Sequence, residues 1–136
     1  MAEESLDLST PYDSLKTEID GYIKYSRLWS AVWAVVYYGL RATLIIFAAS
    51  VAAKTDLRLS SGQVAILSLL VAIGTALDTW LKTGDRYKGH YTFNDKFIAL
   101  YMDLELTSPR NTAAIESIKD QFKKLIDGYA VAVLPA

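Results

Sequence analysis

Two apolar stretches separated by a short polar linker constrain the fold of this chain more than any other feature. They cover residues 28–53 and 63–81, and the linker between them reads KTDLRLSSG. Each stretch is about as long as the ~20 residues that a helix needs to cross the hydrocarbon core of a bilayer. The linker can do little more than turn the chain around. The pair therefore predicts a transmembrane helical hairpin in an all-α protein with two spans.

The distribution of charge agrees with this prediction. The chain has 14 basic and 15 acidic residues. The five charges within residues 28–81 are those of Arg41, Lys54, Asp56, Arg58 and Asp78. Helices of a soluble domain normally keep a charged face toward water, so charge confined to the flanks is typical of a membrane protein. The net charge of -1 and the lack of a basic block argue against nucleic-acid binding.

The N-terminal sequence MAEESLDLST is acidic and lacks the basic and apolar regions of a cleavable signal peptide. Insertion is therefore expected to rely on the chain's own helices. Cytoplasmic flanks of membrane helices are enriched in Lys and Arg. Two basic residues lie in the turn, Lys54 and Arg58, against seven beside the hairpin: Lys16, Lys24, Arg27, Lys82, Arg86, Lys88 and Lys96. We therefore expect a multi-pass protein with both termini in the cytoplasm.

An amphipathic helix is predicted over residues 10–27, before the first apolar stretch. Thr10 can cap its start, and Pro11 suits the first helical position. No stop signal follows, so this helix is expected to continue into residues 28–53. The whole chain, residues 1–136, is short enough to form a single domain.

Two further amphipathic helices are predicted after the hairpin, over residues 92–106 and 109–127. A polar, glycine-containing joint, KTGDRYKGHYT, is expected to precede them. Ser108 and Pro109 repeat the cap-and-proline signal, and Gly128 is placed to end the last helix. Each flanking helix has one apolar stripe that must be buried. A small cytoplasmic helical bundle, completed by oligomerisation, is therefore expected.

Aromatic residues gather at one end of each apolar stretch. Trp29, Trp33, Tyr37 and Tyr38 lie near the start of the first, and Trp80 lies near the end of the second. Trp and Tyr favour the interface between membrane and water. We therefore expect the three tryptophans to lie at one interface, with the boundary near Trp33 and Trp80.

Arg41 is the most informative single residue. Counted from Trp33 at ~1.5 Å per residue, its Cα lies about 12 Å into the membrane, where an arginine costs at least ~2.5 kcal/mol. One hypothesis places Arg41 in a water-filled pore of an oligomer, or in an ion pair with Asp78. The alternative is that it snorkels to the interface, with its stem packed on Tyr37 or Tyr38. These four residues are the candidate pore or intramembrane polar set.

No catalytic, metal or cofactor site is predicted. The chain has no cysteine and one histidine, His90, which forms no metal-binding spacing with other residues. Asp85, Arg86, His90 and Asp95 follow the hairpin in an order that matches no catalytic triad. We expect His90 to contact lipid headgroups or a neighbouring helix. The sequence therefore gives no indication of an enzyme.

The layout resembles the SLATT family of bacterial two-transmembrane effector domains. The resemblance rests on YSRLWSAVWAVVYYGLRATLIIFAAS, on a second segment ending LDTW, and on the following stretch DRYKGHYTFNDKFIALYMDLE. It covers roughly residues 12–106. It implies a protein of the bacterial inner membrane that oligomerises and, when triggered, permeabilises the bilayer. Since no fused sensor is recognisable, a separate sensor or trigger protein is the implied partner, beside the lipid bilayer itself.

The sequence leaves two other functions open. The hairpin could be only an anchor, with the cytoplasmic helices binding a partner as a scaffold. The chain could also be a soluble all-helical oligomer whose two apolar helices form the core. A pore is weakened by the position of its polar residues, because Thr43 and Ser50 fall on a different face from Tyr37 and Arg41.

Overall fold

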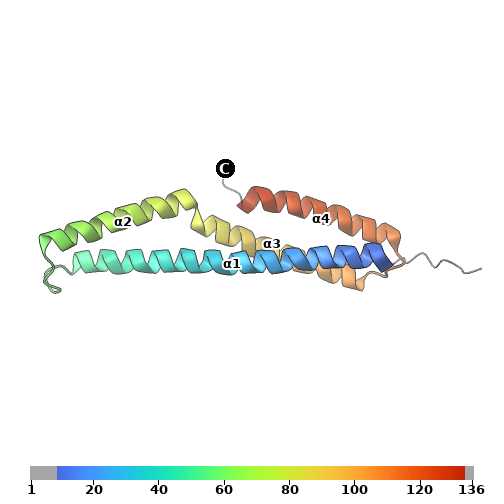
Figure 1. Cartoon of the computed structure of the whole chain (residues 1–136), viewed down its shortest axis with the longest axis horizontal. Helices are drawn as coiled ribbons and strands as arrows, with labels where there is room; N and C mark the ends of the chain where they lie inside the picture. Colours follow the sequence, from blue (N-terminus) through green and yellow to red (C-terminus); the bar gives the residue numbers. More distant parts are fainter. Residues whose placement is uncertain (1–8, 134–136) are drawn as a thin grey trace, which may run out of the picture.

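The computed structural model describes residues 9–133, which form four helices (Figure 1). They are α1 (Ser9–Ala52), α2 (Ser61–Leu81), α3 (Thr83–Leu106) and α4 (Thr112–Val133). Residues 9–133 contain no β-strand, which confirms the all-α prediction. α1 extends along the whole molecule, α2 and α3 together run back beside it, and α4 folds back over α3 (Figure 1).

α1 is a single helix of 44 residues, about 66 Å long at ~1.5 Å per residue. It runs without a break from the predicted flanking helix through most of the first apolar stretch. One face of α1, here called the inner stripe, is buried or half-buried along its length. Its members recur in alternating steps of four and three residues, the spacing of coiled-coil packing: Ile19, Ile23, Ser26, Ser30, Trp33, Tyr37, Leu40, Leu44, Phe47 and Val51.

The polar joint predicted between the hairpin and the third helix is wrong, because these residues are helical. α3 begins at Thr83, and only Lys82 separates it from α2. Lys82 has left-handed backbone angles, φ 49° and ψ 45°, which redirect the chain. Its carbonyl then accepts from the amides of Asp85 and Arg86. Asp85 also places a negative charge in the first turn, where the helix dipole favours it.

The predicted ends of the last helix are also wrong. Ser108 and Pro109 precede the helix, and the side chain of Asn111 accepts from the Ala114 amide at 3.1 Å, as a cap does. At the other end Gly128 is helical, and α4 continues to Val133. A Cβ at Gly128 would lie 3.4 Å from the Phe93 ring, an ordinary van der Waals contact, so this residue lies in the interface between α3 and α4.

The hydrophobic core lies where the first half of α1 packs with α3 and α4. Its fully buried side chains include Phe97 and Phe122, and the Tyr22 ring lies 5.4 Å from both. The other buried apolar members come from all three helices: Leu15, Ile19, Leu100, Leu104, Ile115, Ile118 and Tyr129. Within the chain, this bundle buries the apolar stripes of the flanking helices against one another.

Polar contacts also hold α1 to α3 within this bundle. The side-chain amide of Asn94 donates to Ser26 Oγ and to the Ile23 carbonyl, both at 2.9 Å. The Tyr12 hydroxyl donates to the Leu104 carbonyl at 3.2 Å. These bonds satisfy polar groups in a largely apolar interface, where an unpaired group would be costly. They also define how α1 and α3 align along their length.

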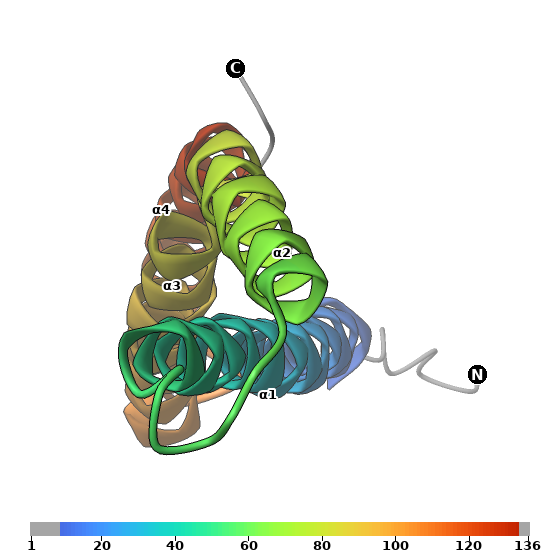
Figure 2. The ribbon, with the colours of Figure 1, turned by 90° about the vertical axis from the view of Figure 1, so that its left-hand side faces the viewer.

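The hairpin formed by the second half of α1 and by α2 extends beyond the bundle, and α3 and α4 lie behind it in Figure 2. Among residues 27–82, only Gly74 is buried. Large apolar side chains point outward instead, including Ile45, Ile46, Ile66, Leu69 and Ile73. Both helices are long and apolar enough to cross a membrane.

Gly74 is expected to be intolerant of alanine. A Cβ there would lie 2.5 Å from Leu44 Cδ2, so Leu44 or the helix backbone must move. Because the end of the Leu44 side chain can move and alanine favours the helix, we expect Gly74→Ala to destabilise the hairpin by about 1 kcal/mol. Denaturant unfolding of the detergent-solubilised protein, followed by circular dichroism, measures this change.

Gly62→Ala is the matched control for that variant. It lies in the same helix with no atom within 4 Å of the added Cβ, so it should be neutral or stabilising by up to about 1 kcal/mol. Combining Gly74→Ala with Leu44→Ala should recover part of the loss, because the clash is removed. Equal stability of Gly74→Ala and Gly62→Ala would show that the two helices are not packed in this register.

Candidate functional site

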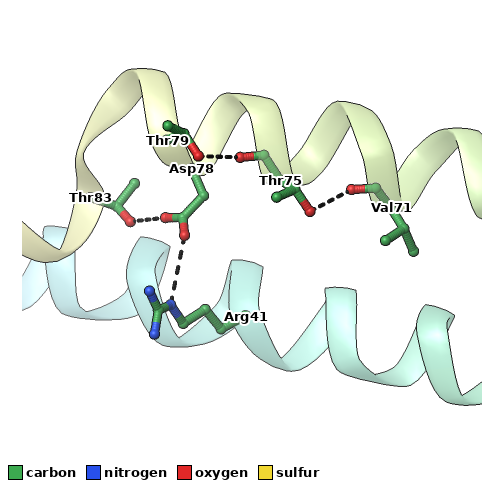
Figure 3. A network of polar contacts seen from close by, with 6 residues as sticks. All are labelled: Arg41, Val71, Thr75, Asp78, Thr79 and Thr83. Carbon is green, nitrogen blue, oxygen red and sulfur yellow. Dashed lines mark hydrogen bonds and ion pairs between the residues drawn. The ribbon is translucent and has the colours of Figure 1, made fainter.

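The structure brings Arg41 of α1 and Asp78 of α2 together inside the apolar hairpin (Figure 3). The Arg41 Nε atom lies 3.6 Å from Asp78 Oδ2. This distance is longer than a hydrogen bond, so the contact is an ion pair without a direct N–H···O bond. The Arg41 side chain is 55% exposed and that of Asp78 is 19% exposed. The pair therefore joins the two helices and leaves part of the guanidinium open to the surroundings.

Asp78 is also tied to the start of α3. Its second carboxylate oxygen accepts a hydrogen bond from the hydroxyl of Thr83, which is fully buried (Figure 3). A carboxylate in the last turn of a helix meets the negative end of the helix dipole. The positive charge of Arg41 and the Thr83 hydroxyl offset this unfavourable contact. Thr83 was absent from the predicted set because the sequence indicated a joint at this position.

Tyr37 packs against the same arginine. The guanidinium carbon of Arg41 lies 4.4 Å from the centre of the Tyr37 ring, a cation–π contact. The Tyr38 ring lies 5.0 Å from that of Tyr37, and the Tyr87 ring lies 6.2 Å from Tyr37 and 5.9 Å from Tyr38. All four residues of the predicted polar set thus lie close together, and Tyr87 of α3 joins them. Tyr87 is not in the predicted set, since the sequence predicts a loop at that residue.

Glycine allows this aromatic packing at the start of α3. A Cβ at Gly84 would lie 2.9 Å from Cε2 of Tyr37, so only glycine lets the ring lie this close to the helix. The register of the hairpin follows from this contact and from the others along it. Gly74 meets Leu44, Asp78 meets Arg41, Gly84 meets Tyr37, and Arg86 meets Trp33.

The three tryptophans lie in different surroundings. The Trp33 ring lies 4.8 Å beneath the Arg86 guanidinium, and the Trp29 ring stacks on His90 at 6.4 Å. Trp80 is 77% exposed on α2. Arg86 is six residues beyond Trp80, about 9 Å along a helix at ~1.5 Å per residue. Trp33 and Trp80 therefore lie at different levels of the hairpin, whereas the sequence predicts one boundary near both.

His90 is buried where α1, α3 and α4 meet. Its Nδ1 atom lies 2.6 Å from the Tyr129 hydroxyl, and its ring stacks on Trp29. This places the histidine against neighbouring helices, one of the two surroundings considered from the sequence. The sequence offered no signal for the partner, because Tyr129 was expected to lie beyond the end of the last helix.

The stability of this junction is expected to fall in acid. Burial, and to a lesser extent the charge of Arg86, lower the pKa of His90 below its ordinary value of 6.5. Burial also raises the pKa of Tyr129 to about 12, so its hydroxyl stays protonated. The unfolded chain then binds a proton near pH 6.5 that the folded chain binds only at lower pH. The free energy of unfolding should be highest above pH 6.5 and decrease as the pH falls through that value.

Chemical denaturation between pH 7.5 and 5.0 measures this dependence. His90 is the only histidine of the chain, so His90→Gln should remove most of the change above pH 5.5. A stability that is constant over this range in the parent protein would contradict the buried, neutral state of His90.

Comparison of this chain with protein-family models, curated proteins and solved structures gave no match. Within residues 9–133, no group of three or more His, Cys, Asp or Glu side chains could hold a metal ion. What the geometry does define is an ion pair with aromatic neighbours in an otherwise apolar hairpin. Such an arrangement can hold two helices together or present a positive charge, depending on what surrounds it.

Proposed function

We propose that the chain is a small integral membrane protein whose hairpin spans the bilayer. The observation that supports this most is the open hairpin: two long apolar helices whose side chains remain largely uncovered, beside a bundle that has its own buried core. Apolar helices of a soluble protein are normally covered by the rest of the fold. The bilayer would cover the outward-facing residues of α2 and of residues 38–52.

The dimensions of α2 agree with a span. Its 21 residues are about 31 Å long, close to the ~30 Å of a hydrocarbon core. A capping box at the start of α2, formed by Ser60 and Gln63, satisfies backbone groups at the end of the span next to the hairpin turn. With the boundary at Trp80, the register places the same level of α1 near Tyr38. Arg41 is then about 5 Å deep, within reach of the interface by snorkelling.

The orientation follows from the basic residues. The side of the hairpin that carries the bundle also carries the larger number of Lys and Arg, so we place it, and both termini, in the cytoplasm. The proposed location is the bacterial inner membrane. This location is taken from the resemblance to SLATT domains.

The function proposed first is that of an oligomeric pore-forming or membrane-perturbing effector, activated by a separate sensor or trigger protein. Its support is the half-exposed guanidinium of Arg41 within the apolar hairpin. An intramembrane charge is expensive and normally faces a water-filled cavity or a partner. Several copies that turn this face toward a common axis would line it with positive charge, which attracts anions.

A membrane-anchored scaffold is the second candidate, and one observation favours it. Arg41 already has a partner in its own chain, since Asp78 and Tyr37 both contact its guanidinium. A pair that is satisfied within one copy needs no pore. In this case the hairpin is only an anchor, and the exposed faces of α3 and α4 bind the partner.

Two measurements separate these functions. Membranes of cells that express the protein are washed with alkaline carbonate, and retention in the pellet until detergent is added supports the spanning hairpin. Release into the supernatant would instead favour a soluble helical oligomer. Purified protein is then reconstituted into liposomes that hold a small anionic dye. Release of the dye supports the effector, whereas sealed vesicles at high protein density favour the scaffold.

A further inference from the structure

α1 carries a second apolar line on the face opposite the inner stripe. Its members, here called the outer stripe, also recur in alternating steps of three and four residues. All eight are exposed: Tyr25, Leu28, Val32, Val35, Gly39, Ala42, Ile46 and Ala49. The stripe contains no charged residue and extends about 36 Å along the helix. α1 is therefore apolar on two opposite faces, of which the fold covers one.

The first half of the outer stripe lies outside the proposed span. The register sets Val35 beside the start of α3 and Tyr25 beside its middle, both beyond the end of α2. Leu28 is 62% exposed and Val35 is 74% exposed there. A bilayer that reached them would also immerse the charged residues of α3 at the same level, including Asp85 and Lys88, at a high cost. Lipid therefore does not account for this half of the stripe.

An open groove between α1 and α4 continues the same surface. Its volume is about 630 Å³, and Tyr25 belongs to both the groove and the stripe. The groove is lined mainly by apolar and aromatic side chains of the two helices, among them Tyr22, Ile126, Tyr129 and Val133. The uncovered surface is therefore one continuous patch from the bundle into the hairpin.

We propose that a second copy of this chain docks on the outer stripe through its own α1, with the two helices parallel. The inference rests on the proposed function, because the membrane orients every copy in the same direction. The occupant must be an apolar helix that crosses the membrane boundary at the same level as α1. A second α1 satisfies this condition by symmetry, and its spacing fits coiled-coil packing.

The composition of the stripe agrees with such a pair. In the half outside the span its members are large, as in the seam of a soluble coiled coil. In the half within the span it includes Gly39 and Ala42, and small residues let two helix backbones approach closely in lipid. The same spacing leads back from Tyr25 through Gly21 to Glu18 on the rim of the groove, where the charge ends the apolar line. The same helix can thus pair with its copy on both sides of the boundary.

Disulfide cross-linking tests the proposal directly, since the chain has no cysteine. Single-cysteine variants are made at every position of residues 25–36, and the proteins in native membrane vesicles are oxidised with copper phenanthroline. We expect dimer yields to peak at the outer-stripe positions, with several-fold lower yields at Arg27. Leu69→Cys on α2 and Met102→Cys on α3, which replace exposed residues, are the controls.

The outcomes distinguish this inference from the proposed function. A peak every three or four residues in membrane-retained protein supports a parallel α1 pair. Equal yields at all positions, or stronger cross-links at Leu69→Cys, would overturn the proposed α1 pair. The proposed spanning hairpin and its dye release would not be affected by that result. If alkaline carbonate extracts the protein from membranes, the proposed spanning hairpin is wrong, whatever the cross-links show. The reason for a parallel pair is then lost as well.

Discussion

Phe97→Ala is expected to disrupt the packing of the three-helix bundle. Phe97 is fully buried, and its ring lies 5.4 Å from that of Tyr22, 6.0 Å from Phe122 and 5.7 Å from Tyr129. Truncation of a buried phenylalanine to alanine costs about 3–5 kcal/mol, because apolar contacts are lost and a cavity remains. Since small domains are stable by only about 5–15 kcal/mol, this variant should weaken the attachment of α4.

Hydrogen exchange of backbone amides measures this effect helix by helix. Protection should fall in α4 and in the second half of α3, while α2 and residues 38–52 keep theirs in a bilayer or detergent. Ile98→Ala is the control, since the neighbouring side chain is 37% exposed and its loss should have a much smaller effect. Similar protection in the Phe97→Ala variant and the parent protein would show that α4 is not held by this core.

Arg41→Leu is expected to reduce the release of an anionic dye from liposomes by at least about tenfold, if the protein forms a pore lined by Arg41. The variant replaces a half-exposed guanidinium by an apolar side chain. Asp78 keeps its hydrogen bond from Thr83 but loses the compensating charge of Arg41, so the membrane retention of the variant is measured beside its dye release. Under the scaffold hypothesis the same variant should change neither release nor membrane retention.

Two further variants make that result specific. Lys54→Leu removes a positive charge in the turn of the hairpin and should leave dye release unchanged. Exchange of the pair, Arg41→Asp with Asp78→Arg, keeps the contact between the two helices and moves the positive charge to α2. If the exchanged protein is stable but inactive, the position of the charge matters for release. Full release from the Arg41→Leu variant would remove Arg41 from the proposed mechanism.

Arg41 and His90 differ in how much of their surroundings can be predicted from the sequence. Arg41 could be singled out because a charge within an apolar run is conspicuous without any structure. Its pairing with Asp78 was one of several alternatives, and the choice depended on how the two helices align. His90 bonds to Tyr129, 39 residues away, and no local pattern indicates such a pair.

The errors in the helix boundaries have a shared physical cause. KTGDRYKGHYT contains two glycines and many polar residues, which locally favour a joint. The helix forms because those glycines lie against other elements: Gly84 against Tyr37, and Gly89 against the end of α4, with the Ala132 carbonyl 3.3 Å from a Cβ built there. Gly128 likewise lies against Phe93 rather than ending α4. Close packing favours glycine at positions 84 and 89, and a sequence pattern cannot tell such a glycine from a helix-breaking one.

What the sequence determined by itself is the class of the fold: an all-helical chain with two long apolar helices joined by a short turn. Hydrophobic length and helical spacing are local properties, so they are readable residue by residue. The tertiary structure decided the register of α1 against α2 and α3, and with it the Arg41–Asp78 pair and the different levels of Trp33 and Trp80. These depend on which side chains interlock across helices, such as Leu44 over Gly74. Such contacts join residues far apart in the chain, and only the folded arrangement brings them together.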